Sequence, residues 1–239
     1  MVQFNQDLGF VQALDEHLNA GHRILSAPDY AHARINDHSL FNKFSNVLSF
    51  RIGGKDEDGN PTALYWHPVI NSIDDLRTLV NELKSWYAQG LTDSFALKVP
   101  RGKYLKLLEE AKSQIGESRT LWYISSDLLK DSIAGIVNLD DALNSTEIVP
   151  FFGSVNLARD YVQKMRTFGK INIGVWHEKK DSNIDNPQGR VLVFGGDYYN
   201  ILGAGGYDGN WRFAGVPFDA AQKNSPSPNS FLERLLNSP

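Results

Sequence analysis

Hydrophobic residues recur at helical spacing in two stretches of the N-terminal half. The first covers residues 8–18 and is followed by Gly21, a residue that favours the end of a helix. The second follows Asn71 and Ser72, either of which can cap a helix, and ends at Gly90. Its apolar stripe consists of Ile73, Leu76, Leu79, Val80, Leu83 and Trp86. We therefore expect two amphipathic helices that each pack one face against a core.

Alternation of apolar and polar residues marks the strands. Leu48, Phe50 and Ile52 alternate before a cluster of Gly, Asp, Asn and Pro, and the pattern resumes at Ala63, which predicts a hairpin. In residues 190–194 both faces are apolar, as expected for a strand near the centre of a sheet that is covered on each side. Shorter apolar runs predict strands at 22–28, 94–100, 120–125, 147–152 and 170–178, the last paired with 190–196 as a second hairpin. Helical patterns cover 101–116, 126–137, 154–169 and 231–236, with Leu105, Leu108 and Ile115 facing inward in the first of these.

Short strands interspersed with amphipathic helices predict an α+β fold. We expect a mainly antiparallel mixed sheet with packed helices. Residues 33–56 and 158–181 both run from an Ala-Arg pair to a Lys-Asp pair with the same spacing, so the chain could consist of two similar lobes. The corresponding division is an N-terminal lobe over 1–118 and a C-terminal lobe over 119–239. Chance reuse of turn residues explains the echo better than duplication does, in which case the chain is one domain.

Composition and charge exclude several classes of protein. The chain of 239 residues is 41% hydrophobic and 22% charged, as in an ordinary globular protein, and it has no cysteine for disulfides or thiolate chemistry. Its net charge of -4 and pI near 5.9 argue against a nucleic-acid binder, because phosphate neutralisation needs a clustered excess of Lys and Arg. The N-terminal stretch does not resemble a secretory signal, and no apolar run reaches the roughly 18 residues of a membrane span. We expect a soluble, cytoplasmic protein.

Glycines and aromatic residues crowd together between Phe194 and Phe218. These 25 positions hold seven of the chain's 20 glycines and seven of its 27 aromatic residues. A dinucleotide-binding loop needs a third glycine three residues after Gly205, where this chain has Asp208, and no helical pattern follows. Asp208 and Gly209 instead have the composition of a two-residue hairpin turn. We call residues 194–218 the Gly/aromatic segment and interpret its glycines as turn and strand residues.

The rings of the Gly/aromatic segment have two interpretations. They could fill the faces of a sheet, since aromatic residues favour strands whether or not a ligand is present. Alternatively, a hairpin from residue 198 to 213 could present them as a platform for a ligand. The predicted contact set is then Tyr198, Tyr199, Tyr207, Trp211 and Arg212. Arg212 lies between two aromatic residues and would suit stacking or an anionic group.

Metal and standard catalytic motifs are not complete in the sequence. Asp56, Asp58 and Asn60 have the alternate spacing of a calcium loop, but Pro61 and His67 stand where that loop needs glycine and glutamate. The sequence has no G-x-S-x-G, H-E-x-x-H or Walker motif. We expect no metal and no cofactor. His177 shares strand parity with apolar residues and is expected at the edge of a core face, although it is also kept as a candidate binding residue.

One enzymatic layout is suggested by the order of segments. The succession "RTLWYIS", "PFFGSVNLARDYV" and "INIGVW" resembles the ADP-ribosyltransferase family, with Arg119 and Ser154 in the places of the family's Arg and Ser. The chain departs from the family because no Glu-x-Glu, nor a lone Glu, begins a strand at a suitable place after Ser154. The nicotinamide-ribose contact therefore has no candidate carboxylate.

Two functional hypotheses follow. The first is a binding or interaction protein that uses the aromatic, Gly-rich hairpin to contact an unknown protein, small molecule or glycan. The second is a transferase or hydrolase that acts through scattered polar residues, with His177, Asp197, Arg119 and Ser154 as candidates.

Overall fold

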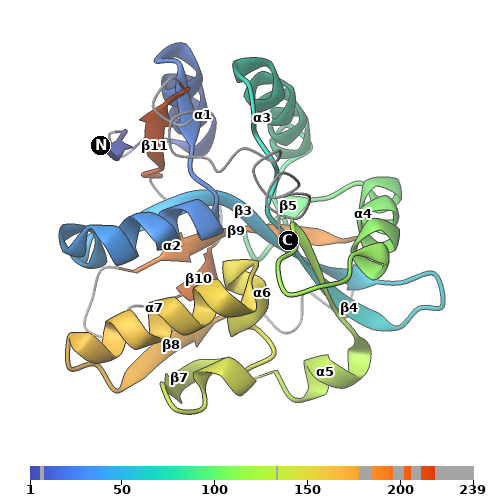
Figure 1. Cartoon of the computed structure of the whole chain (residues 1–239). Helices are drawn as coiled ribbons and strands as arrows, with labels where there is room; N and C mark the ends of the chain where they lie inside the picture. Colours follow the sequence, from blue (N-terminus) through green and yellow to red (C-terminus); the bar gives the residue numbers. More distant parts are fainter. Residues whose placement is uncertain (6–7, 133, 178–184, 196–201, 206–210, 219–239) are drawn as a thin grey trace, which may run out of the picture.

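The structure is a computed structural model that describes residues 1–5, 8–132, 134–177, 185–195, 202–205 and 211–218 (Figure 1). Its helices are α1 (Phe10–Asn19), α2 (Ala27–Asn36), α3 (Ile73–Tyr87), α4 (Arg101–Ser113), α5 (Ser126–Lys130), α6 (Ile148–Phe152) and α7 (Val155–Thr167), with 3₁₀ turns η1 (His38–Asn42) and η2 (Ala142–Asn144). Its strands are β1 (Gln3–Phe4), β2 (His22–Ile24), β3 (Ser45–Lys55), β4 (Pro61–Trp66), β5 (Leu97–Lys98), β6 (Leu121–Ile124), β7 (Gly135–Asn138), β8 (Asn172–Trp176), β9 (Gln188–Phe194), β10 (Leu202–Gly205) and β11 (Ala214–Pro217). The predicted α+β class is confirmed.

The large sheet has the strand order β6-β4-β3-β9-β10-β8-β7, and all its pairs are antiparallel except β10 with β8. The predicted hairpin is the antiparallel pair β3–β4, and β9 lies next to β3 at the centre. The edge of β9 that faces away from β3 takes two partners end to end, β5 at Gly189 and β10 from Val191 onward. The sheet thus draws its strands from both sides of the predicted boundary between residues 118 and 119.

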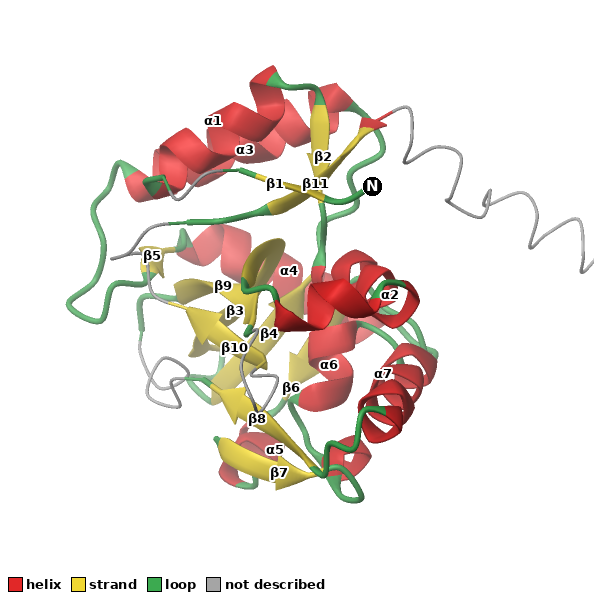
Figure 2. Cartoon of the chain, turned by 90° about the vertical axis from the view of Figure 1, so that its left-hand side faces the viewer, coloured by secondary structure: helices red, strands yellow, loops and turns green. Residues whose placement is uncertain are grey.

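A smaller sheet, β1-β11-β2, joins the N-terminal strand to the last strand that the structure describes. Figure 2 shows this sheet with α1 and α3 above the large sheet, while α2, α6 and α7 cover one face of the large sheet. Two apolar cores result. We call them the α2–α7 core, which includes Phe152, Tyr161 and Phe194, and the α1–α4 core, which includes Phe10, Leu83 and Phe213.

Local sequence signals begin and end the main helices as expected. The Ser72 hydroxyl accepts a hydrogen bond from the Asp75 amide, and the Asp75 carboxylate accepts one from the Ser72 amide, which forms a capping box at the start of α3. Ser26 and Asp29 form the same arrangement at α2. All five buried residues of α3 belong to the predicted apolar stripe. The stripe therefore decides which face of the helix enters the core.

The predicted strand at 147–152 is wrong, because the structure has the helix α6 there. Pro150 has no amide hydrogen to give to a sheet, and burial of Ile148, Phe151 and Phe152 follows helical spacing. Gly153 ends this helix with φ of 67°, in the left-handed region. A short apolar run of this kind cannot be assigned from periodicity alone.

The expected second hairpin is also wrong. β8 and β9 are not paired with each other, because β10 lies between them and bonds to both. Residues 202–205 pair with β9 along their whole length and with β8 at Leu202 and Gly203, and they do not pair with residues 211–213. Trp211 and Phe213 instead bridge to Leu8 and Asn46. The order of strands in a sheet depends on long-range pairing that local patterns do not contain.

Two helix predictions need smaller corrections. The helix expected over 126–137 ends at Lys130, and its second half forms strand β7. In α4, Leu108 faces the core as expected, but Ile115 lies beyond the end of the helix and is 88% exposed. The buried side of α4 is made by Tyr104, Leu107, Leu108 and Ala111.

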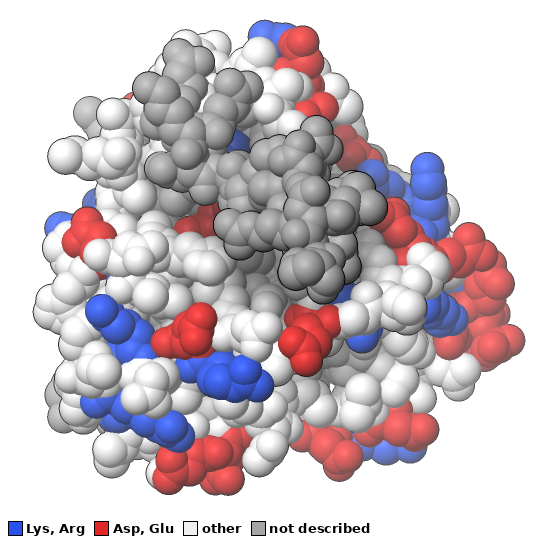
Figure 3. All heavy atoms as spheres, viewed as in Figure 1, with Lys and Arg blue, Asp and Glu red and all other residues white. Residues whose placement is uncertain are grey.

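The described surface carries both signs of charge. Lys and Arg side chains are interspersed with Asp and Glu side chains on the face drawn in Figure 3. A large single-sign field of the kind that steers nucleic acid is therefore not present on the described part of this face. Every helix within the described ranges is too short or too polar to cross a membrane.

Candidate functional site

One face of the large sheet carries exposed apolar side chains. Ile136 of β7 and Trp176 of β8 are 53% and 51% exposed, whereas their neighbours Val137 and Val175 are buried in the α2–α7 core. Because successive side chains of a strand point to opposite faces, Ile136 and Trp176 point away from that core. We call the surface formed by the exposed Ile136 and Trp176 and the partly exposed Val193 the open face.

Gly203 is buried on the same side of the sheet as Trp176. It pairs with Trp176 of β8 and with Val193 of β9. A Cβ atom at this position would lie 3.2 Å from Val193 Cγ2 and 3.6 Å from Trp176 Cβ. Gly174, opposite Ile136, likewise has no side chain. Both glycines are buried, so the part of this face that a ligand could contact is formed by the side chains of Ile136 and Trp176.

The Gly/aromatic segment begins next to the open face and is fixed there by a buried arginine. Arg34 of α2 is fully buried, and its Nη2 donates a hydrogen bond of 2.9 Å to the Gly195 carbonyl oxygen. The guanidinium also lies over the rings of Tyr30 and Phe194, at 5.1 and 5.0 Å from their centroids. This anchor holds the main chain immediately after β9.

The other end of the segment is fixed through its main chain as well. The Trp211 amide donates to the Leu8 carbonyl oxygen at 2.7 Å, and the Asn5 side chain bonds to the Trp211 carbonyl oxygen and the Phe213 amide. The Arg212 carbonyl oxygen accepts from the Asn46 amide at 2.8 Å. Both ends of the stretch 196–210 are therefore held by bonds that involve backbone atoms.

The structure places the predicted contact residues as follows. Tyr198, Tyr199 and Tyr207 lie outside the described residues. Trp211 is 2% exposed, and its ring lies against Phe10 and Phe213, so this ring agrees with the packing interpretation. Arg212 is partly buried, and a contact role for its side chain stays a prediction.

His177 belongs to a buried polar cluster. Its side chain is 1% exposed, and its Nε2 lies 2.8 Å from Ser132 Oγ and 3.5 Å from Glu147 Oε1. Glu147 also accepts two hydrogen bonds of 3.2 Å from Arg51 and one from the Tyr65 hydroxyl. Burial would raise the pKa of Glu147, but the Arg51 guanidinium and His177 outweigh it and lower the pKa to about 2. The hydrogen bonds of this cluster link β3, β4 and α6, and a binding role for His177 stays a prediction.

Arg119 and Ser154 are matched to the ADP-ribosyltransferase family only by the order of their segments. In the structure, both residues line one cavity of about 420 Å³. Their backbones lie side by side, because the Arg119 amide donates to the Gly153 carbonyl oxygen at 2.8 Å. Their side chains are engaged elsewhere: the Ser154 hydroxyl caps α7, and the Arg119 guanidinium lies 4.6 Å from the centroid of the Trp122 ring. Asp197 lies outside the described residues. The transferase or hydrolase alternative stays a prediction.

His67 reaches the same cavity from the end of β4. Its two ring nitrogens lie 2.9 Å from Ser49 Oγ and 2.8 Å from the Pro150 carbonyl oxygen. Burial lowers the pKa of His67 to about 4, so the ring is neutral near pH 7. With both nitrogens engaged, His67 is held as a structural link between β4 and α6.

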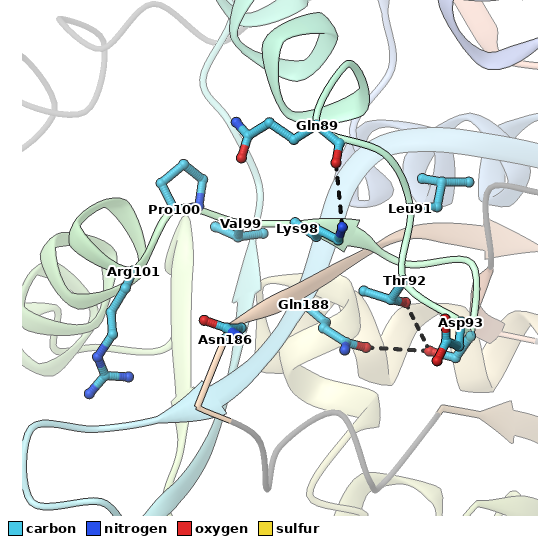
Figure 4. A pocket seen from close by; sticks show the side chains of 11 residues that line it. Gln89, Leu91, Thr92, Asp93, Lys98, Val99, Pro100, Arg101, Asn186 and Gln188 are labelled. Atoms are coloured by element: carbon cyan, nitrogen blue, oxygen red, sulfur yellow. Dashed lines mark hydrogen bonds between the residues drawn. The ribbon is translucent and has the colours of Figure 1, made fainter.

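A larger cavity, of about 850 Å³, lies where β5 meets the start of β9. Figure 4 shows Lys98 reaching toward Gln89 and Gln188 reaching toward the turn at Thr92 and Asp93, while Arg101 points away from them. We call it the β5–β9 cavity. Its polar walls are formed by Gln89, Thr92, Asp93, Ser94, Asn186 and Gln188.

The sequence pattern did not reveal the open face. An alternation of Ile, Gly and Trp in short strands resembles that of any half-buried strand. The exposed positions become visible only when α2, α6 and α7 are seen to cover the opposite face. The one available signal was the strand parity of His177, which places Trp176 on the other face from Ile173 and Val175.

Comparison with known proteins identifies a structural neighbour. No protein-family model matches the sequence, and a search of curated proteins finds no match. A solved structure described as "Accommodation of massive sequence variation in Nanoarchaeota by the C-type lectin fold" is similar to this chain, with a TM-score of 0.71 and 27% sequence identity. The similarity covers 90% of this chain and 96% of that chain. It is consistent with a binding protein.

Proposed function

We propose that this chain is a binding protein that takes up a protein ligand on the open face and on the adjacent Gly/aromatic segment. The observation that carries the proposal is the half-exposed Trp176, which lies with Ile136 at the β7–β8 end of a sheet face, beyond the part that the α1–α4 core covers. Exposed apolar surface of this kind is typical of interaction sites, and aromatic residues are enriched in the contacts that contribute most to binding.

The anchors of the Gly/aromatic segment support the same proposal. Arg34 and Asn5 hold the ends of the stretch 196–210 by its backbone at Gly195 and Trp211. Side chains between these anchors can change without loss of either bond. The neighbour's description states that the C-type lectin fold accommodates massive sequence variation. We propose that the stretch 196–210 of this chain is a position of tolerated variation, on which ligand specificity depends.

The test uses two matched isoleucines. The wild-type chain is immobilised, a protein is captured from a lysate of the source organism, and the purified protein is titrated calorimetrically against variants. Ile136→Ser and Trp176→Ala are expected to weaken binding at least about tenfold. Ile171→Ser is the control, because Ile171 is 70% exposed and shares strand parity with the opposite face. Equal affinity in all four proteins, or no captured protein that binds in the titration, would exclude the proposal.

A further inference from the structure

We infer that the β5–β9 cavity is a subsite for an extended polar peptide segment of the ligand. This inference rests on the proposed function, because it extends the contact surface from the open face to a second place on β9. The cavity volume of about 850 Å³ is in the range of sites that enclose small ligands.

The cavity offers side chains with unused hydrogen-bonding groups. Gln188 accepts a hydrogen bond from Ser94 through Oε1 at 3.3 Å, and its amide nitrogen bonds to no described residue. The Asn186 amide and the Asp93 carboxylate likewise have no side-chain hydrogen bond within the described structure. A ligand can therefore bind these groups without breaking a bond of the protein.

The walls of the cavity are already fixed in place. Ser94 accepts a hydrogen bond of 2.9 Å from Arg190 Nη2 and lies 3.1 Å from the Thr92 hydroxyl. The Thr92 hydroxyl in turn accepts from the Ala96 amide at 3.0 Å. Pairing of β5 with β9 fixes the end of this loop. Little conformational entropy remains to be lost when a ligand binds to such a wall.

The cavity lies near the proposed contact surface along strand β9. β5 pairs with β9 at Gly189, and the last described residue of β10, Gly205, pairs with Val191 on the same edge. Gln188, the residue of β9 that lines the cavity, thus lies three residues before Val191, the partner of Gly205 in the Gly/aromatic segment. A ligand bound at the segment can continue into the cavity.

The chemistry of the lining favours a peptide. A side-chain carboxamide presents one acceptor and a donor pair in a plane, which matches the acceptor and donor of a peptide bond. Gln89, Asn186 and Gln188 supply three such groups, and the charged residues of the lining are Asp93, Lys98 and Arg101. The described lining has no aromatic ring on which a sugar could stack. The backbone of an extended peptide can pair with the carboxamides, and its polar side chains can pair with the charged groups.

The probe in the experiment is a peptide obtained by selection on the protein itself. Phage-displayed random linear peptides are selected on the full-length protein, and an enriched peptide is titrated calorimetrically against variants. The double variant Asn186→Ala/Gln188→Ala is expected to weaken peptide binding about tenfold or more. Asn42→Ala/Gln163→Ala is the matched control, since both residues are exposed and do not line the cavity. Thermal unfolding checks that each variant folds.

The outcomes separate the inference from the proposed function. Failure to enrich any peptide, or equal affinity in the cavity and control variants, overturns the peptide subsite. If the captured protein ligand still depends on Trp176 in that case, the proposed function stands alone. Titration with maltotriose and chitotriose forms a second arm. Binding of either sugar that disappears in the cavity variant would replace the peptide class by a glycan and overturn the inference.

Discussion

Arg51 and Glu147 form a two-bond ion pair inside the protein, with Nε and Nη2 each 3.2 Å from a carboxylate oxygen and side chains that are 2% and 0% exposed. The pair joins β3 to the start of α6 and so fixes the position of this helix. The sequence pattern predicts a strand there. Removing one partner would leave a buried charge without compensation.

The first prediction concerns the stability of this pair. Glu147→Ala should lower the free energy of unfolding by about 3–5 kcal/mol, because Arg51 would remain charged and buried. The double variant Arg51→Met/Glu147→Leu should lose clearly less stability, since neither charge of the pair is left without its partner. Urea unfolding of the three proteins measures both effects. A double variant that is as unstable as the single one would show that packing, and not charge, dominates at this position.

The second prediction concerns acid. The pKa of Glu147 is lowered from 4.5 to about 2, so the folded state prefers the ionised carboxylate more than the unfolded state does. The stabilisation is complete above pH 4.5 and is lost as the pH falls toward 2. Urea midpoints measured across this range should decrease for the wild type. Glu147→Gln should remove part of that slope, and an unchanged slope would contradict the assigned shift.

The third prediction concerns two buried histidines. Burial lowers the pKa of His17 and His67 from 6.5 to about 4, so both are neutral in the folded state. The contribution of the two neutral rings to the free energy of unfolding is complete above pH 6.5. It is lost as the pH falls toward 4, because the unfolded state then binds more protons than the folded state. The double variant His17→Gln/His67→Gln should flatten the stability curve in this range. The variant Glu147→Gln acts at lower pH and serves as the control.

The fourth prediction contrasts two tryptophans. Trp211 is 2% exposed and packs on Phe10, so Trp211→Ala should cost about 3–5 kcal/mol of stability. Trp176 is 51% exposed, and Trp176→Ala should change stability by no more than about 1 kcal/mol while it weakens ligand binding. Thermal unfolding of both variants provides the comparison. If Trp176→Ala proved to be as unstable as Trp211→Ala, loss of binding in that variant would reflect unfolding.

The helices with strong local signals could be predicted from the sequence. The stripe of α3, its Ser72 cap and the hairpin β3–β4 follow from residues that are close together in the chain. Such features depend on backbone geometry and on burial of one face, which a single segment already specifies. The α+β class follows from the same local patterns.

Tertiary structure alone decided which surfaces are covered. Ile148–Phe152 forms a helix because packing of α6 against α7 overrides a weak local preference for a strand. β10 lies between β8 and β9 because strand pairing is long-range. The same holds for function. Trp176 and Trp211 belong to the same residue type, yet one is half-exposed and the other is buried. Composition identifies an excess of rings and glycines, but only the arrangement of helices over the sheet determines which side chains a ligand can reach.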